Sequence, residues 1–219
     1  MLAMFWGAIG HLNAQLYWNT NGVTGNWTDS NWGSSSGGPF TTGFTNNTNV
    51  IFTANSTVNG RTASTGNITV NSNVLVSFGT GTGSFGTGGN VRTFDVGSSG
   101  VLDFASTPWS GSAGTGIIKE GQGILKLTGD AAWVGGFTLN NGTIIVGGVN
   151  AMGGGASNTL TINGGAIAAD SNRDLTGKYG GGITIGGNFT LGAVTTGVPS
   201  GNGTSTANIT FSNNVSLGA

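Results

Sequence analysis

The chain repeats one short unit, made of a strand, a polar turn and a second strand, at intervals of about twenty residues. Each unit has an apolar residue directly before a turn rich in Asn, Gly and Ser, and we call this residue the anchor. The anchors are Val70, Val96, Ile118, Leu139, Ile162, Ile185 and Phe211, with Ile51 as an earlier candidate. Subtracting successive numbers gives steps of 26, 22, 21, 23, 23 and 26 residues. Such a near-constant step predicts coils stacked in a solenoid, because one coil cannot bury its own apolar face.

Within the units, a Thr often lies between two apolar residues. This alternation occurs at residues 68–70, 137–139, 160–162, 183–185 and 209–211. Neighbouring side chains of a strand point to opposite faces, so we expect the anchors to face inward and the Thr side chains outward. Gly and Asn supply the positive φ that tight turns need. A β-sandwich of hairpins has similar strands, but the near-constant step favours stacked coils.

The composition excludes several classes of function. Charged residues make up 6% of the 219 residues and the net charge is −1, which is far from the basic patch that nucleic-acid binding requires. Cys is absent and His11 is the one histidine, which excludes disulfides, thiolate or histidine metal sites and serine–histidine catalysis. We therefore expect no cofactor and no metal. The 45 Gly and only 3 Pro, with persistent strand patterning, argue against a disordered linker.

The middle of the chain carries the most specific pattern, an apolar pair and Lys-x-Gly-x-Gly, then Leu-x-Leu-x-Gly, a loop, an Asn/Gly turn and an apolar strand. The residues that fit are Ile117, Ile118, Lys119, Gly121, Gly123, Leu125, Leu127, Gly129, Gly135, Gly136, Asn141, Gly142 and Ile144. This segment resembles the autotransporter passenger-associated repeat, although its loop, residues 130–135, diverges. The resemblance implies a right-handed parallel β-helix in an exported bacterial protein of the autotransporter or adhesin type. The motif itself contains no catalytic group.

The beginning of the chain is rich in Trp. Residues 17–19, 25–27 and 31–33 each contain one Trp and resemble the opening of such exported β-solenoid proteins. We expect an N-terminal cap, in which bulky aromatic side chains cover the open core of the first coil. The alternative is a platform for carbohydrate stacking formed by Trp18, Trp27 and Trp32.

These patterns divide the chain into three parts. Residues 1–14 are apolar and end in Ala14, and we expect a truncated signal peptide there, the alternative being an apolar strand. Residues 15–48 form the expected capping region. Residues 49–219 form the repeats of an all-β parallel β-helix, which we expect to continue beyond Ala219. No apolar run is long enough to span a membrane as a helix.

The candidate binding residues lie in a long connection within the repeats. Asp170, Arg173, Asp174 and Lys178 form the densest group of charges in the chain. Binding loops commonly emerge from solenoids at such connections. The simpler interpretation is a solvated loop whose local ion pairs contribute little.

Two other kinds of chemistry have definite geometric requirements. A carbohydrate-active enzyme needs two or more carboxylates that face one groove, and the candidates here are Asp95, Asp103, Asp170 and Asp174. Glu120 falls in a turn, where we expect a surface role. Binding of ice or another crystal surface needs one straight, exposed row of Thr69, Thr138, Thr161, Thr184 and Thr210.

The sequence therefore predicts a non-catalytic extracellular module, a passenger or stalk that is adhesive or structural. The alternative is a carbohydrate-active enzyme or a polysaccharide-binding module. We expect the protein to be secreted or held at the bacterial outer surface. Its expected partners are glycans or proteins of host or environmental surfaces, with no nucleic acid, and a membrane only through an anchor outside this sequence.

Overall fold

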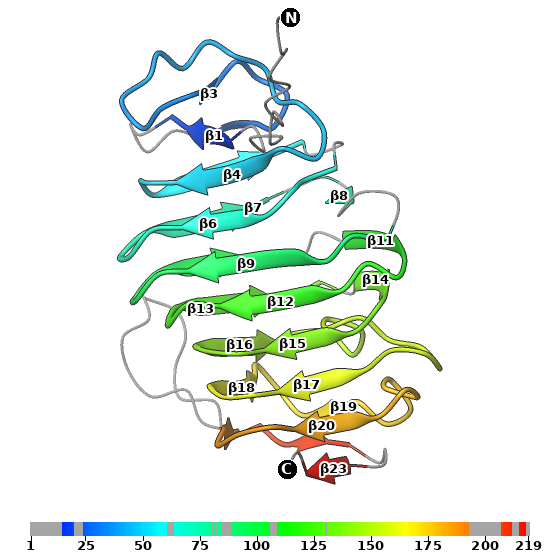
Figure 1. Cartoon of the computed structure of the whole chain (residues 1–219). Coiled ribbons are helices and arrows are strands. Elements are labelled where there is room, and N and C mark those ends of the chain that lie inside the picture. The colour runs from blue at the N-terminus through cyan, green and yellow to red at the C-terminus, as the bar shows by residue number, and fades with distance from the viewer. Residues whose placement is uncertain are drawn as a thin grey trace, which may run out of the picture.

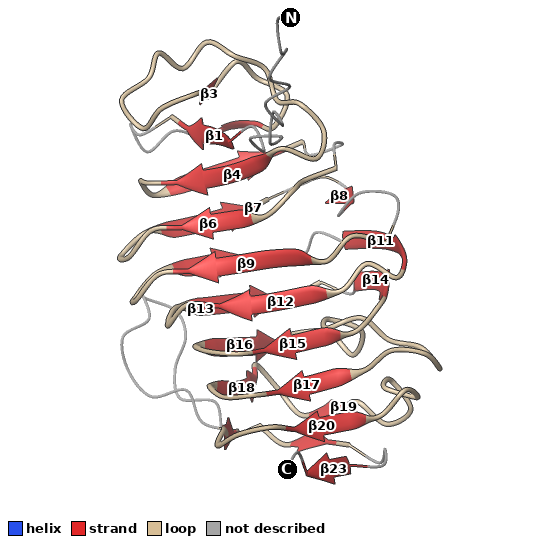
Figure 2. Ribbon diagram, viewed as in Figure 1, coloured by secondary structure: helices blue, strands red, loops and turns tan. Residues whose placement is uncertain are grey.

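The computed structural model describes residues 15–19, 24–60, 64–79, 81, 83–84, 89–105, 109–129, 131–192, 207–211 and 215–217. All regular secondary structure in these residues is β-strand, so the expected all-β class is confirmed (Figure 2). No helix long and apolar enough to cross a membrane is found among them. The expected signal peptide, residues 1–14, lies outside the described residues.

Two long sheets form two sides of a right-handed solenoid, with the chain starting at one end and finishing at the other (Figure 1). The ten-stranded first sheet contains, in order, β23 (Val215–Leu217), β20 (Ile183–Ile185), β17 (Leu160–Ile162), β15 (Phe137–Leu139), β12 (Ile117–Glu120), β9 (Arg92–Val96), β6 (Ile68–Val70), β4 (Asn49–Phe52), β1 (Gln15–Trp18) and β3 (Trp32–Gly33). The eight-stranded second sheet contains β2 (Thr24–Asn26), β5 (Ser56–Asn59), β7 (Leu75–Phe78), β10 (Val101–Asp103), β13 (Ile124–Leu127), β16 (Thr143–Val146), β18 (Ala166–Ala169) and β21 (Thr190–Leu191). Neighbouring strands are parallel throughout, except for the antiparallel pair β1–β3. The predicted parallel β-helix is thus confirmed.

Shorter elements occupy the third side of the solenoid. A three-stranded sheet contains β8 (Gly83–Ser84), β11 (Trp109–Ala113) and β14 (Ala131–Val134), and a two-stranded sheet contains β19 (Arg173–Asp174) and β22 (Ile209–Thr210). Strand β14 lies inside residues 130–135, where the sequence predicts a loop. This part of the prediction is wrong because β11 of the preceding coil provides a parallel partner for the backbone of β14.

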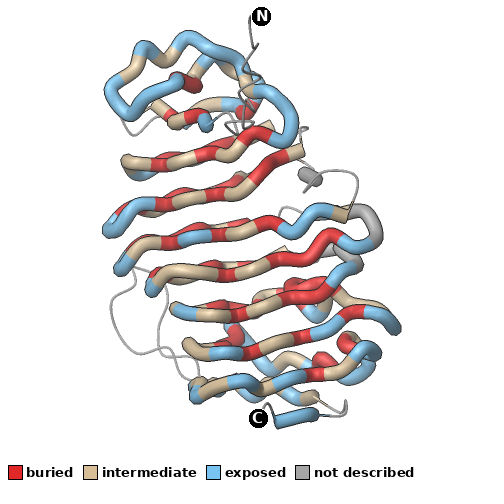
Figure 3. Tube along the Cα trace, viewed as in Figure 1, coloured by how far each residue is buried: buried red, intermediate tan, exposed pale blue. Residues whose placement is uncertain are grey.

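The core lies between the two long sheets and follows the predicted alternation (Figure 3). The anchors Val70, Val96, Leu139 and Ile162 are buried, and the intervening Thr side chains are partly exposed. Register pairs Val70 with Val96, and Leu139 with Ile162. Inward side chains therefore stack from coil to coil, which is the arrangement that lets neighbouring coils bury one another.

The prediction is wrong for two other anchors, because an error of one residue turns a side chain to the opposite face of a strand. Ile51 is partly exposed, and its neighbour Phe52 is the buried residue. Ile118 is also partly exposed, because Lys119 is the inward residue that pairs with Leu139 in the next coil.

The last anchor is misplaced for a different reason. Phe211 directly follows β22, which pairs with β19 on the third side of the solenoid. Leu217 in β23 is the residue that pairs with Ile185 in the first sheet. The connection between these two first-sheet strands is thus longer than the repeat step predicts, and β23 belongs to the first sheet instead of the second.

The turn that follows the first-sheet strand changes its position between β9 and β12, the strand that contains Lys119. Val96 is the last inward residue of β9, but Gly121 comes opposite it, since Glu120 pairs with Asp95. A Cβ on Gly121 would lie 2.3 Å from the Val96 carbonyl oxygen, so a side chain has no room there. The last inward side chain of β12 is instead that of Lys119, which is fully buried.

Asparagine side chains extend the hydrogen-bond ladder beyond the strands. Asn49 Oδ1 accepts a bond from the Asn67 amide, and Asn67 Oδ1 accepts one from the Thr93 amide, both at 2.9 Å. In the same way Asn55 Oδ1 accepts a bond from the Leu75 amide at 2.8 Å. Each bond joins neighbouring coils where the backbone leaves the sheet, so these Asn side chains take the place of strand carbonyls.

The first sheet ends at its N-terminal side with strand β3. It runs antiparallel to β1 and places Trp32 opposite Trp18. The rings of Trp18 and Trp32 lie 4.8 Å apart, those of Trp27 and Trp32 lie 4.9 Å apart, and Trp32 Nε1 donates a 3.0 Å bond to the Trp27 carbonyl. Strands β1 and β2 each join a long parallel sheet, so the expected capping region, residues 15–48, contributes to the coils as well.

Candidate functional surface

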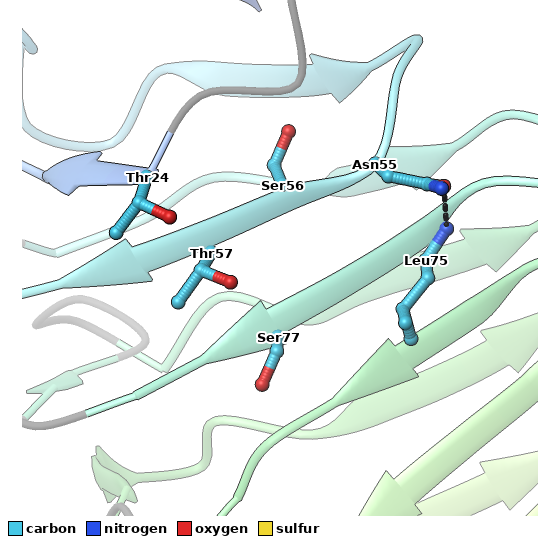
Figure 4. Close-up of a pocket in the computed structure, with 6 residues that line it drawn as sticks. All are labelled: Thr24, Asn55, Ser56, Thr57, Leu75 and Ser77. Carbon is cyan, nitrogen blue, oxygen red and sulfur yellow. Dashed lines mark hydrogen bonds between the residues drawn. The ribbon is translucent and has the colours of Figure 1, made fainter. Parts of the chain in front are cut away.

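The outer face of the second sheet contains a shallow concavity near the N-terminal end of the solenoid (Figure 4). It encloses about 160 Å³ and is lined by Thr24, Asn55, Ser56, Thr57, Leu75 and Ser77. These residues come from the neighbouring strands β2, β5 and β7 and from the residue before β5. Every polar group in the lining is a neutral hydroxyl or amide.

Register places three of these hydroxyls in one line. Thr24 pairs with Thr57, and Thr57 pairs with Ser77. We call these three residues the hydroxyl row. Parallel strands are about 4.8 Å apart, so the hydroxyl groups repeat at about that spacing along the solenoid. None of the three hydroxyls forms a hydrogen bond within the described part of the chain.

In the following coils, the outer positions in register with the hydroxyl row carry other kinds of side chain. Asp103 pairs with Ser77 and with Lys126, and the Lys126 ammonium lies 3.1 Å from the Asp103 carboxylate. Beyond them come Ile145 and Ala168, which are buried although they lie on the outer face. The line thus runs from hydroxyls through an ion pair to apolar side chains.

The threonines of the first sheet form a shorter row than the sequence predicts. Thr138, Thr161 and Thr184 are in register on β15, β17 and β20. Thr69, however, pairs with Asp95, and Thr210 lies in β22 on the third side. One straight row of all five threonines does not form, so the geometry required for binding an ice or crystal surface is incomplete.

The four aspartates proposed for an enzyme do not face one groove. Asp95 is on the first sheet, Asp103 is on the second sheet with Lys126, and Asp170 and Asp174 follow β18. Asp95 and Glu120, in contrast, are register partners on neighbouring strands of the first sheet.

Glu120 is held by asparagines from the next coils. Its Oε1 accepts a 2.5 Å bond from Asn140 Nδ2, and Asn140 Oδ1 accepts a 2.8 Å bond from Asn163 Nδ2. This polar ladder along one edge of the first sheet is not evident from the sequence, where Glu120 and the two asparagines are separated by about twenty residues each. Only the coil register brings them together.

The predicted binding residues form a local group after β18. The Arg173 guanidinium lies 2.5 Å from the Asp170 carboxylate. Asp174 Oδ1 accepts a 2.9 Å bond from the Thr176 amide, and hydrogen bonds from the Thr176 side chain and backbone lower the pKa of Asp174. The Lys178 stem lies beside Gly154 of the preceding coil. Ion pairing and turn formation account for three of these four residues without a ligand.

The carbohydrate platform expected as an alternative for the tryptophans is not present. Trp18, Trp27 and Trp32 are each fully buried, so none of them offers a ring face to a sugar. The described residues also contain no group of three or more His, Asp or Glu side chains that could hold a metal ion.

No family model, no curated protein and no solved structure matches the chain.

Lys119 is the most unusual charged residue in the described structure. Its ammonium donates hydrogen bonds to the carbonyl oxygens of Glu120, of Gly121 at 2.8 Å and of Asn141 at 3.4 Å. Burial lowers the pKa of Lys119 to about 8, while the nearby Asp95 and Glu120 carboxylates act in the opposite direction. The sequence offers one signal for this role, since Lys119 replaces an apolar residue at an inward position of the alternating pattern.

Proposed function

We propose that this chain is a non-catalytic module of an exported surface protein, a stalk whose outer faces adhere to glycans or proteins. The observation that carries the proposal is the continuous coil-to-coil pairing from β1 to β23 along the first sheet. An unbroken parallel ladder of this kind forms a stiff rod that grows by about 4.8 Å with each coil. Such a rod holds a binding surface away from its point of attachment.

The surface chemistry favours adhesion over turnover. Charged residues are only 6% of the chain, and Asp103 and Asp170 each form an ion pair with a neighbour. Hydroxyl side chains occupy the outer positions of β15, β17 and β20 on the first sheet and form the hydroxyl row on the second. Such groups bind by hydrogen bonds and do not supply the proton transfers that hydrolysis or elimination requires.

The place of action rests on the resemblance of residues 117–147 to the autotransporter passenger-associated repeat. These residues form one coil, β12 to β14, and the first two strands of the next, β15 and β16. We infer from this resemblance that the module works outside the bacterial cell, secreted or held at the outer membrane. The buried tryptophans at the start of the first sheet support a capping role for residues 15–48.

A second candidate is a carbohydrate-active enzyme built on Asp95 and Glu120. Their backbones are in register on adjacent strands, and two carboxyl groups about 5 Å apart are the arrangement of retaining glycosidases. Against this candidate, Glu120 Oε1 already accepts a hydrogen bond from Asn140. This bond occupies a carboxylate oxygen that a general acid or nucleophile needs free for its substrate.

The two functions are separated by one experiment on the full chain. The protein is incubated with insoluble polysaccharides and with protein-coated beads, and both its depletion from solution and the release of reducing ends are measured. Adhesion predicts depletion with no release of sugar. Release of sugar that disappears in the double variant Asp95→Asn, Glu120→Gln would establish the enzyme instead. Antibody labelling of intact cells tests the proposed location, and signal only after lysis would contradict it.

A further inference from the structure

The geometry points to the concavity on the second sheet as a binding subsite for a neutral polysaccharide chain. This inference rests on the proposed adhesive function and names the ligand class and the residues that bind it. The lining of the concavity presents several hydroxyls in register, from β2, β5 and β7.

The charge of the lining determines the charge of the ligand. None of the six lining residues is ionisable. The nearest charges in the same line of positions, Asp103 and Lys126, neutralise each other at 3.1 Å. An anionic polymer finds no unpaired cation here, and a cationic ligand finds no unpaired carboxylate. A ligand that is itself neutral and hydrogen-bonding pays the smallest desolvation cost at this surface.

The hydrogen-bonding capacity of the site matches a polyol. Thr24, Thr57 and Ser77 each offer a hydroxyl that both donates and accepts and that forms no bond within the described chain. Asn55 Oδ1 accepts a 2.8 Å bond from the Leu75 amide. The NH₂ group of Asn55 is the part of this side chain that can donate to a ligand. Sugar hydroxyls supply the complementary acceptors and donors.

The shape of the site favours one unit of a chain over an isolated small molecule. Its volume of about 160 Å³ is below the range of roughly 300–1,000 Å³ that encloses drug-sized ligands. The hydroxyls repeat at about 4.8 Å along the rod, which is the direction in which a polymer could contact each coil in turn. The Leu75 side chain adds an apolar surface beside the hydroxyl row, which suits the C–H face of a sugar ring (Figure 4).

The test compares three neutral probes, cellohexaose, xylohexaose and maltohexaose, with hexagalacturonate as an anionic probe. Binding to the full chain is measured by titration calorimetry. We expect at least one neutral probe to bind and hexagalacturonate not to bind. Thr57→Val keeps the β-branched shape and removes the central hydroxyl, so it should weaken binding of that probe by about 3- to 10-fold, as expected for loss of one hydrogen bond. Thr57→Ser keeps the hydroxyl and should bind like the parent chain.

Thr161→Val on the first sheet is the matched control and should leave the affinity unchanged. Urea midpoints of all variants establish that they are folded before binding is compared. If no neutral probe binds, or if only hexagalacturonate binds, the inference is overturned. If a neutral probe binds and Thr57→Val binds it equally well, this subsite is wrong, while the adhesive function proposed above stands. If the beads and insoluble polysaccharides also fail to deplete the chain, the adhesive function fails as well.

Discussion

Lys119 and Leu139 are register partners on β12 and β15, so a cation and an aliphatic side chain occupy equivalent inward positions in consecutive coils. Both are fully buried. The aliphatic stem of Lys119 continues the apolar core, and its ammonium reaches the carbonyl oxygens of the turn that follows β12 and of the turn one coil further. A single side chain thus provides core packing and closes two turns.

Titration of Lys119 should make the protein more stable in mild alkali. Its pKa is about 8 in the folded chain and 10.5 in the absence of burial, so between these values the unfolded chain binds more protons than the folded chain. Stability therefore rises with pH across this window, by roughly 3 kcal/mol, and is flat below it. Urea unfolding at pH 7, 8, 9 and 10 measures the effect. Lys119→Met should lack the rise, and an equal rise in that variant would assign it to another group.

Inward and outward residues of one strand should differ sharply in their tolerance of charge. Leu139→Asp places an unpaired charge in a dry core and should cost several kcal/mol. Thr138→Asp, one residue away on the outer face, should cost within about 1 kcal/mol. Urea midpoints for this pair, and for Ile162→Asp with Thr161→Asp, check the register. Equal losses at both faces would show that the register is wrong.

Gly142 should be replaceable by no other residue. It has a φ of 74°, and a Cβ there would lie 2.4 Å from the carbonyl oxygens of Gly121 and Gly123. Gly177 has a similar φ of 70° with nothing within 4 Å of the added Cβ. Gly177→Ala should therefore show only backbone strain of about 1 kcal/mol, and Gly142→Ala at least about 2 kcal/mol more. Thermal unfolding of the two variants gives the difference, and similar losses would contradict the close coil packing.

Removal of the Asn67 side chain should be detectable at the Thr93 amide, which donates a hydrogen bond to it. Asn67→Ala leaves the Thr93 amide without its acceptor, which should cost about 1 kcal/mol and speed hydrogen exchange at Thr93. Asn71→Ala is the control, because Asn71 is an exposed turn residue that uses its backbone amide for the bond to Phe52. Unchanged protection of Thr93 in Asn67→Ala would rule out the side-chain bridge.

The tryptophan cluster should stabilise the N-terminal coils. Trp32→Ala removes a fully buried ring that contacts Trp18 and Trp27, and should cost about 3–5 kcal/mol. Trp32→Phe keeps an aromatic ring but loses the bond to the Trp27 carbonyl, so its loss should be smaller. If residues 15–48 act as a cap, Trp32→Ala should also self-associate in sedimentation velocity, since it weakens the strand that covers the edge of β1. A monomeric Trp32→Ala variant would contradict the capping role.

The repeat architecture can be read from the sequence because its physical cause is local. Alternation of Thr with Val, Ile or Leu determines which face of a strand is buried, and Val70, Leu139 and Ile162 follow it. The error at Ile118 arises instead from contacts between residues of different coils. An apolar residue was expected inside and a lysine outside, and only the carbonyl oxygens of two successive turns make the buried ammonium tolerable.

The candidate site was less predictable, because its residues come together through coil register and not through sequence motifs. Thr24, Thr57 and Ser77 are unremarkable hydroxyl residues in a chain rich in them. Their alignment depends on how many residues each coil uses between its first and second strands, which a one-residue uncertainty in any turn would change. The charged group at residues 170–178 was easier to find and is explained by local pairing.

The step at Gly121 restricts how this protein can be lengthened in evolution or by design. A repeat that places a side chain at this position cannot follow the β9 coil, because its Cβ would lie 2.3 Å from the Val96 carbonyl oxygen. The coils from β15 to β20 share the register of Leu139, Ile162 and Ile185, and their turns need glycine as well. A Cβ on Gly165 would lie 2.4 Å from the Gly142 carbonyl oxygen, and one on Gly187 would lie 2.2 Å from that of Asn163. Duplication or exchange of whole repeats is therefore compatible with the fold only where the inserted repeat brings a glycine to each of these turn positions.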